Sequence, residues 1–196
     1  VVLYAGNKEA QHSYIEIAKD KGYQVLLLDS PIIPHLIQKL ESDNSGLTFV
    51  RVDSDHIDNL IKKEETAISK LSTEEQESLK TVVETIVPKQ TYTVQLEALD
   101  SSAAPFIITQ PEFMRRMKER SQTGGSGMFG MGNFPEMYNL VVNTNSDLAT
   151  SILNNEDKTV QENLVKQALD LAKLSQNLLK GEALTAFVKR SFEMIK

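Results

Sequence analysis

Short apolar runs alternate with amphipathic segments over residues 1–52. The runs VVLYA (1–5), QVLLLD (24–29) and LTFVRV (47–52) are aliphatic and bounded by Gly, Pro, Asp or Ser, which is typical of buried strands. Residues 8–21 and 32–42 instead place apolar side chains at helical spacing, and the first segment ends at Gly22, a suitable helix C-terminus. This alternation predicts a small three-layer α/β unit, with a short parallel sheet covered by helices.

Between residues 53 and 89 the chain is acidic and its apolar residues have helical spacing. Ser72 and Glu75 have the spacing of a capping box, and Pro88 is expected to end the helix that follows. The Gly and the terminal Glu of a calcium-binding loop are missing from the acidic run at the start of this stretch. We interpret that run as a solvated helix start: Asp53, Asp55 and Asp58.

Strand patterns return after Pro88, and helices complete the chain. Alternation predicts strands at 91–99, 105–109 and 137–143. Asp147 can cap a short helix, and longer helices are expected at 158–179 and, after a break at Gly181, up to residue 195. The pattern predicts an α+β, mainly helical second part. We therefore divide the chain into an α/β unit (1–55), a helical connection (56–88) and a helical dimerisation domain (89–196).

The last two predicted helices are amphipathic but too few to enclose a core of their own. Packing against the same pair from a second chain would complete a four-helix bundle, which predicts a homodimer. Alternatively, the pair covers the local sheet, because helical spacing does not identify the partner. The apolar positions predicted to form the dimer interface are Leu164, Ala168, Leu171, Leu178, Leu184, Phe187, Val188, Phe192 and Ile195.

Residues 111–137 join a short amphipathic helix to a segment rich in Gly and Met, 122–136. Five of the nine Gly lie between Gly124 and Gly132. Met side chains adapt to differently shaped partners, so the combination indicates binding and not chemistry. Within the helix predicted at 111–122, the apolar stripe consists of Phe113, Met114 and Met117. Two interpretations stay open, because this stripe could form an exposed recognition surface or dock on the adjacent strands.

Composition excludes several classes of protein. A net charge of −6 argues against a nucleic-acid binder, which needs a basic stripe to neutralise phosphates. The one basic cluster, Arg115, Arg116, Lys118 and Arg120, is interrupted by acidic residues, so we interpret it as a solvated helix face. With no Cys, disulfides and thiolate chemistry are excluded, and a cytoplasmic setting is compatible. No apolar run approaches the ~20 residues of a membrane span.

Motifs for catalysis and cofactor binding are missing. The turn AGNKEAQ (5–11) contains only Gly6 and lacks the spacing of a dinucleotide fingerprint or a P-loop. The histidines His12, His35 and His56 lie singly, and we expect each to be a surface or partly buried structural residue. We predict no cofactor and no metal for this chain. The alternative function is an α/β module that binds a phosphorylated small molecule at 5–11, fused to a helical dimerisation domain.

In the order of its elements, the chain resembles the heat-shock protein 90 family, of the bacterial high-temperature protein G type. The resemblance covers essentially the whole chain and follows VVLYAGNKEAQHSYIEIAKDKGYQVLLLDSPI (1–32) and FVRVDSD (49–55). It continues through the acidic connection and PEFMRRM (111–117) to the ending FVKRSFEMIK (187–196). It implies the end of the family's middle region followed by the C-terminal dimerisation domain. The start without Met agrees with a piece of a longer protein.

The resemblance also implies a function. The family consists of ATP-driven dimeric chaperones, and its ATP and Mg²⁺ site would lie upstream of Val1, so no catalytic residue is assigned and this chain would not itself be an enzyme. Binding of nonnative client proteins would fall on Phe113 and Met117, with Met114 beside them. His35 and Gln38 would add to that surface, although an aromatic residue expected near His35 is missing. A cytoplasmic location and a bacterial Hsp70-type chaperone system as a further partner are also implied.

Overall fold

The computed structural model describes residues 1–61, 67–116 and 137–195. Its internal contacts divide the chain into two compact units. The first unit comprises Val1–Glu64 and Thr109–Tyr138, and the second comprises Glu65–Ile108 and Asn139–Lys196. Residues 109–138 are thus grouped with the first unit, whereas the sequence pattern assigns them to the predicted dimerisation domain. The boundaries at residues 55 and 88 stay a prediction.

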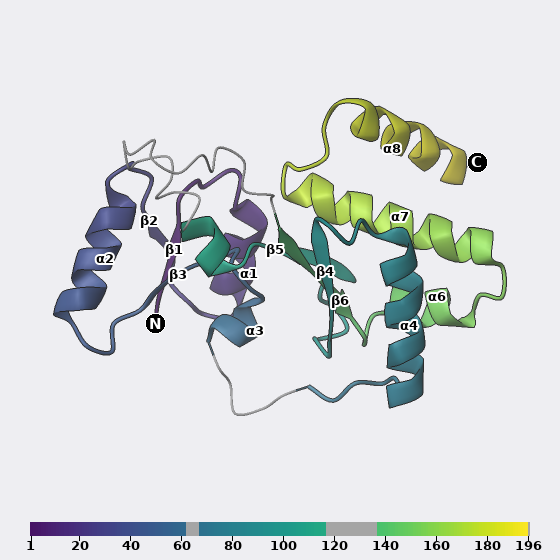
Figure 1. Ribbon diagram of the computed structural model, residues 1–196, viewed down its shortest axis with the longest axis horizontal. Coiled ribbons are helices and arrows are strands. Elements are labelled where there is room, and N and C mark those ends of the chain that lie inside the picture. Colours follow the sequence, from purple (N-terminus) through teal and green to yellow (C-terminus); the bar gives the residue numbers. More distant parts are fainter. Residues whose placement is uncertain (62–66, 117–136, 196) are drawn as a thin grey trace. The chain divides into compact units, whose positions relative to one another are not determined.

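The first unit is built on a three-stranded parallel sheet (Figure 1). Its strands lie in the order β2-β1-β3. In this sheet Tyr4 pairs with Leu26 on one side and with Arg51 on the other. The predicted parallel sheet of the α/β unit is therefore confirmed. The strands are β1 (Val2–Ala5), β2 (Leu26–Leu27) and β3 (Phe49–Arg51).

Two helices, α1 (His12–Asp20) and α2 (Ile33–Asp43), lie on opposite sides of this sheet, and the short α3 (Ile57–Leu60) follows β3. Helix α1 starts later than predicted, because side-chain acceptors hold residues 6–11 in a turn. It ends at Asp20, two residues before Gly22, where a φ of 82° suits the glycine expected just beyond the helix. Helix α2 packs on the sheet through a buried cluster of Tyr4, Ile37 and Phe49.

Strand β2 differs from the prediction of a fully buried strand at 24–29. It has only two residues, and Leu26 and Leu27 are 48% and 52% exposed. The reason is its position at the edge of the sheet, where only one side of the strand is covered by a neighbour. An aliphatic run therefore does not distinguish an edge strand from a central one.

The second unit combines a sheet of order β4-β6-β5 with four helices (Figure 1). Helix α4 packs against β4, α6 and α7, while α8 contacts α7. The fully buried side chains at the centre of this unit include Leu79, Leu140 and Ile152. The strands are β4 (Tyr92–Glu97), β5 (Phe106–Thr109) and β6 (Tyr138–Asn143), and the helices are α4 (Thr73–Ile86), α6 (Asp147–Asn154), α7 (Lys158–Ser175) and α8 (Gly181–Met194).

The ends of these helices can be compared with the caps and boundaries predicted from the sequence. The capping box at the start of α4 is confirmed, with Ser72 and Glu75 each accepting a hydrogen bond from the other's backbone N–H. Ser146, and not Asp147, caps α6. Helix α7 ends at Ser175, before the predicted residue 179, because Asn177 takes a left-handed φ of 55° and reverses the chain.

A buried cluster of neutral polar side chains connects separate segments of the second unit. The Asn143 amide accepts from the backbone N–H of Leu99 at 3.2 Å and donates to the carbonyl of Asp100 at 2.9 Å. The Asn145 amide accepts from the backbone N–H of Lys70 at 2.7 Å and donates to the carbonyls of Ile68 and Leu99. These bonds join the chain before α4 to the ends of β4 and β6.

Candidate functional site

The predicted client-binding residues of helix 111–122 are only partly within the described structure. Residues 112–116 are helical. The Phe113 side chain is 74% exposed, whereas Met114 is partly buried. Met117, with the Gly- and Met-rich segment 122–136, lies outside the described residues. His35 and Gln38 are both exposed on α2. The first unit thus presents Phe113 to solvent, and the role predicted for these residues stays a prediction.

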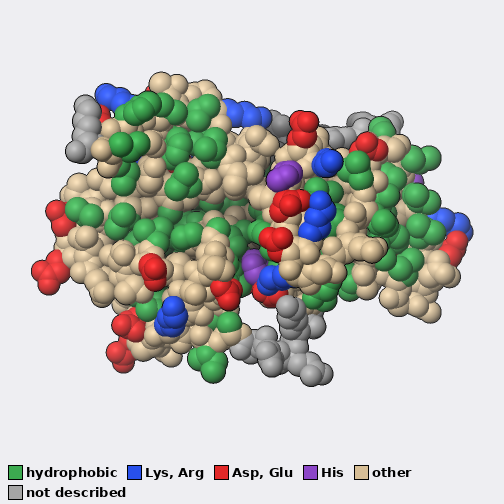
Figure 2. Space-filling view, turned by 180° about the vertical axis from the view of Figure 1, so that it is seen from behind, with side chains coloured by type: hydrophobic (Ala, Val, Ile, Leu, Met, Phe, Trp, Pro, Cys, Tyr) green, Lys and Arg blue, Asp and Glu red, His purple; other side chains and the backbone are tan. Residues whose placement is uncertain are grey.

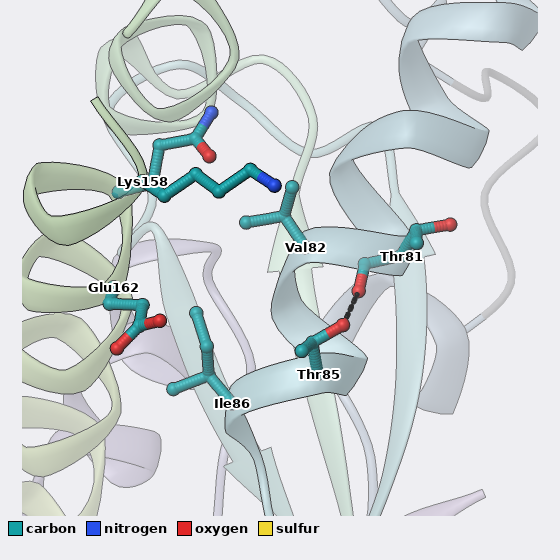
Figure 3. A pocket seen from close by; sticks show the side chains of 7 residues that line it. Thr81, Val82, Thr85, Ile86, Lys158 and Glu162 are labelled. Atoms are coloured by element: carbon teal, nitrogen blue, oxygen red, sulfur yellow. Dashed lines mark hydrogen bonds between the residues drawn. The ribbon is translucent and has the colours of Figure 1, made fainter. Parts of the chain in front are cut away.

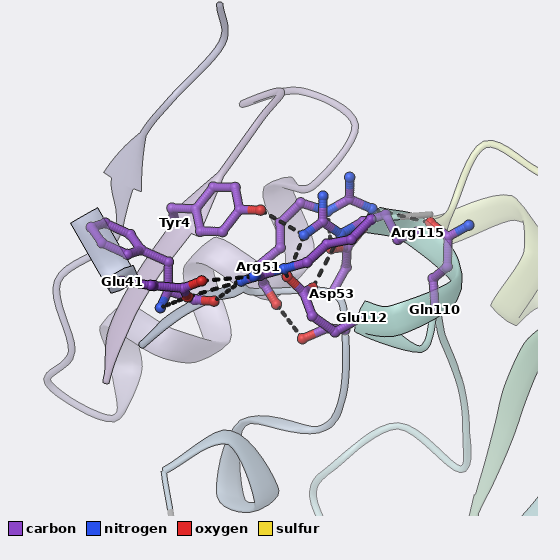
Figure 4. A network of polar contacts seen from close by, with 10 residues as sticks. Tyr4, Glu41, Arg51, Asp53, Gln110, Glu112 and Arg115 are labelled. Atoms are coloured by element: carbon purple, nitrogen blue, oxygen red, sulfur yellow. Dashed lines mark hydrogen bonds and ion pairs between the residues drawn. The ribbon is translucent and has the colours of Figure 1, made fainter. Parts of the chain in front are cut away.

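Arg115 anchors the same helical segment to the sheet of the first unit (Figure 4). The residue is 3% exposed, and its guanidinium donates a hydrogen bond of 2.6 Å to the Tyr4 hydroxyl. The guanidinium also pairs with the Glu112 carboxylate, and its Cζ lies 5.7 Å from the centre of the Tyr4 ring. A buried arginine is stable only when its charge is paired and its N–H groups are bonded, and both conditions are met here.

Arg116 makes a second anchor on α2 and β3. Its Nη1 and Nη2 donate to the two carboxylate oxygens of Glu41 at 2.8 and 3.1 Å, in the two-pronged geometry that favours arginine. Nη2 also donates to the Phe49 carbonyl at 2.7 Å. The bond from Arg116 lowers the pKa of Glu41, and Glu41 in turn raises the pKa of Arg116. Both charges are therefore stabilised by the folded arrangement.

A third contact fixes the chain just before the helical segment. The backbone N–H of Gln110 donates to the carbonyl of Asp53 at 3.0 Å. The Asp53 carboxylate pairs with Arg51 at 2.6 Å, and Arg51 donates to the Gln110 side chain at 3.1 Å. We name the Arg51–Asp53–Gln110 contacts and the Arg115 and Arg116 anchors together the arginine network.

This network corrects two interpretations of the sequence. Arg115 is buried and Arg116 is partly buried, so the basic cluster is not a solvated helix face at these positions, while Lys118 and Arg120 lie outside the described residues. Asp53 is also buried, with Arg51 as its partner, and is not part of a solvated helix start. The sequence did contain a signal for the paired arginines. Glu112 precedes Arg115 by three residues and Arg116 by four, so in a helix it can pair with both.

The predicted dimer residues, which lie on or next to α7 and α8, divide into three groups by their exposure. Ala168 and Phe187 are buried within the chain's own second unit. Leu164, Leu178 and Leu184 are partly buried. The remaining four are exposed, by 43% for Val188 up to 81% for Ile195, and they are Leu171, Val188, Phe192 and Ile195. Figure 2 shows hydrophobic side chains gathered on the surface around α8.

Helix α8 is held on α7 by side-chain hydrogen bonds as well as by Phe187. Arg190 donates to Gln167 at 2.8 Å and pairs with Asp170 at 2.6 Å. Gln167 also donates to the Ser191 hydroxyl at 3.0 Å. These contacts set the rotation of α8 about its axis, so the side of α8 that carries Val188 and Phe192 faces away from the rest of the unit.

A groove of about 230 Å³ lies between α4 and α7 in the second unit (Figure 3). Val82 and Ile86 form its apolar side, and Lys158 and Glu162 line the α7 side with opposite charges. The Thr85 hydroxyl donates to the Thr81 carbonyl at 2.8 Å, so it is already bonded. We assign this groove no ligand, because the charges of Lys158 and Glu162 oppose each other and the Thr85 hydroxyl is already bonded.

The turn at 5–11, the alternative phosphate site, has its backbone donors occupied. The N–H groups of Gly6 and Asn7 donate to the Gln11 side chain at 2.8 and 3.0 Å. Those of Glu9 and Ala10 donate to the Asn7 side chain at 3.0 and 2.9 Å. A phosphate would need these same groups, so the geometry does not favour the alternative. Among the described residues, no group of three or more His, Asp and Glu could hold a metal ion.

Comparisons with known proteins show that the sequence of this chain is similar to those of bacterial chaperones. Chaperone protein HtpG of Porphyromonas gingivalis is 41% identical over 177 residues, which cover 89% of this chain and 26% of the relative. Chaperone protein HtpG of Bacteroides thetaiotaomicron is 34% identical over 262 residues, which cover 100% of this chain and 38% of the relative. No family model matches the chain.

The resemblance recognised in the sequence is therefore confirmed: the chain is similar to HtpG proteins over nearly its whole length. It spans only about a quarter to two fifths of the length of these relatives. The Bacteroides alignment runs over 262 residues against the 196 of this chain, so that relative has residues in the aligned region that this chain lacks. In the part of the chain that the structure describes, no helix has the length and apolar character needed to span a membrane.

Proposed function

We propose that this chain is the C-terminal part of an ATP-dependent molecular chaperone of the HtpG type, in which it forms a homodimer and binds nonnative client proteins. The observation that carries the proposal is the similarity to HtpG chaperones along nearly the whole chain. ATP binding and hydrolysis would belong to an N-terminal part of the whole protein, and ATP and Mg²⁺ would be its cofactors. We assign no catalytic residue to this chain.

Client binding is proposed for Phe113, with Met114 and Met117 beside it and with His35 and Gln38 as further contacts on α2. The support is the exposure of Phe113 on an otherwise anchored helical segment. Burial of one Phe side chain gains about 1.5–3 kcal/mol, so a single aromatic contact gives weak, reversible binding. Weak contacts suit a chaperone, which must release its clients.

Dimerisation is proposed through the exposed side of α7 and α8. Four of the predicted dimer residues are exposed apolar side chains, against Phe113 alone in the described helical segment, and they are Leu171, Val188, Phe192 and Ile195. An exposed set of this kind is typical of an obligate contact between subunits, whose core resembles a protein interior. Ala168 and Phe187 would support the interface from beneath. A cytoplasmic location and a bacterial Hsp70-type chaperone system as a partner complete the proposal.

The proposal is tested by Phe113→Ser. Light scattering of a thermally aggregating client is measured with the unchanged protein and with the variant. Loss of the apolar contact should reduce the suppression of aggregation several-fold. Ile68→Ser is the matched control, because Ile68 is also an exposed apolar residue, at 88%, but lies in the second unit. Equal suppression by Phe113→Ser and the unchanged protein would contradict the assignment of Phe113.

A further inference from the structure

Phe113 and Arg115 point to opposite sides of one short helical segment. Successive residues in an α-helix are rotated by about 100°, so side chains two positions apart lie on opposite faces. Phe113 is 74% exposed and Arg115 is 3% exposed, as this geometry requires. Arg115 is therefore on the side of the helical segment that is bonded to the α/β unit, and Phe113 is on the side that is open to a partner. The two side chains are less than one helical turn apart, so fixing one also orients the other.

The groups that bond to Arg115 and Arg116 come from three elements of the first unit that are far apart in the sequence. Tyr4 belongs to β1, Glu41 to α2, and the Phe49 carbonyl to β3. Glu41 also accepts from the backbone N–H of Phe49 at 2.8 Å, so the acceptor for Arg116 is itself held in place. The orientation of the helical segment is thus determined by the folded α/β unit and not by the segment alone.

We infer that Arg115, Arg116 and Glu41 are positioning residues, which hold Phe113 in a fixed outward orientation on the α/β unit. The inference rests on the proposed client-binding role of Phe113. A side chain that is already ordered before binding loses less conformational freedom on contact with a client, and this increases affinity without adding any contact. Weakening the network should therefore reduce client binding even though none of these three residues touches the client.

The chain offers a direct reporter for this inference, because it contains no Trp. Phe113→Trp introduces the only indole of the chain at the exposed position, and selective excitation of this indole gives an anisotropy that reports motion on the nanosecond scale. The full 196-residue chain carrying Phe113→Trp is compared with and without Arg116→Met or Glu41→Gln. Glu41→Gln removes the charge and keeps the shape of the side chain, while Arg116→Met removes the guanidinium and keeps an unbranched apolar stem. Both changes avoid the deeply buried Arg115. Asp43→Asn is the control, since Asp43 pairs with Lys39 on the same helix α2 but is exposed and outside the network.

Client affinity is measured in parallel with a reduced, carboxymethylated and fluorescein-labelled small protein as the nonnative client. We expect Arg116→Met and Glu41→Gln to lower the anisotropy of the introduced indole and to raise the dissociation constant about fivefold. Asp43→Asn should change neither quantity. Far-UV circular dichroism of each variant verifies that the α/β unit remains folded.

The possible outcomes separate this inference from the proposed function. Unchanged anisotropy in both network variants would overturn the inference. Lower anisotropy with unchanged client affinity would overturn it as well, since the network would then serve the fold only. If Phe113→Ser leaves client binding intact, the proposed role of Phe113 fails, while the anisotropy still decides whether the network orders position 113.

Discussion

The segment 110–116 of the first unit and the chain before α4 in the second unit are fixed by different kinds of polar group. The first unit uses ion pairs between arginines and carboxylates, and most of these side chains retain some contact with solvent. The second unit uses neutral amides and hydroxyls, with Asn143 and Thr144 almost completely buried. Burying an amide whose bonds are all made costs far less than burying a charge. Partial exposure therefore lowers the cost of the charges of Arg51 and Arg116, whereas the buried Arg115 depends on its bonds to Tyr4 and Glu112.

The two surfaces proposed for binding also differ in the number of apolar side chains that they expose. The helical segment of the first unit offers one large aromatic side chain, Phe113. The α7–α8 side of the second unit exposes a set of side chains, Leu171, Leu174, Val188, Phe192 and Ile195. Because the free energy of association rises with the apolar area buried, the first surface suits a transient client and the second a permanent partner.

The largest effect is expected at the α7–α8 surface. The double change Val188→Ser and Phe192→Ser removes two exposed apolar side chains, each worth about 2 kcal/mol or more at the centre of an interface. The dissociation constant of the proposed dimer should therefore rise by about 700-fold or more. Sedimentation equilibrium measures the change, with Glu193→Ser as an exposed control on the same helix. A dimer of unchanged affinity would show that α8 does not form the contact.

The sequence predicts the helices and strands better than it predicts the contacts between them and their exposure to solvent. Strands and helices followed from apolar spacing, because burial of one face imposes a fixed period on the residues that form it. The arginine network could not be predicted in this way, since Arg116 and Glu41 are 75 positions apart in the chain. The exposure of β2 was also missed, because the order of strands in a sheet is a tertiary property.

In the candidate site, too, the sequence predicts the helix but not which of its side chains are buried. Helical spacing identified Phe113 as a member of an apolar stripe, but the stripe alone does not say which side chain faces solvent. That depends on Arg115, whose burial requires the Tyr4 hydroxyl and Glu112 to be in reach. Among the predicted dimer residues, Phe187 and Val188 are neighbours in sequence, yet only Val188 is exposed, because Phe187 packs inside the second unit.

A second prediction concerns the neutral polar cluster of the second unit. Asn145→Ala removes three hydrogen bonds, to Lys70, Ile68 and Leu99, and leaves their backbone groups without these partners. The free energy of unfolding should fall by about 3 kcal/mol, since each buried group left unsatisfied costs about 1–3 kcal/mol. Urea titration measures the loss. Asn154→Ala, at the exposed end of α6, is the control and should change stability little. A small effect at Asn145 would mean that water replaces the amide.

The smallest effect is expected from pH, and it should appear in the first unit only. His56 is buried and its Nδ1 accepts from the backbone N–H of Asp58 at 3.4 Å, at the start of α3. Burial lowers the pKa of His56, although the nearby Asp58 carboxylate opposes this shift. The unfolded chain therefore binds a proton more readily than the folded chain, and stability decreases as the pH falls below the ordinary His value of about 6.5.

The matched pair His56→Asn and His12→Asn tests this pH dependence. Asn is a favourable residue at the N-cap of a helix, the position that His56 holds at α3, so His56→Asn keeps the cap but cannot titrate. The free energy of unfolding, measured by urea titration at pH 7.5 and 5.5, should fall by less than about 1.4 kcal/mol in the unchanged protein, the worth of one pKa unit. This loss should disappear in His56→Asn and persist in His12→Asn, because His12 is exposed. An equal loss in all three proteins would place the titrating group elsewhere. As the pH falls below about 4.5, the ordinary pKa of a Glu, the unfolded chain binds a proton at Glu41 before the folded chain does, because the bond from Arg116 lowers the pKa of Glu41. The stability contributed by this pair should therefore decrease further with falling pH.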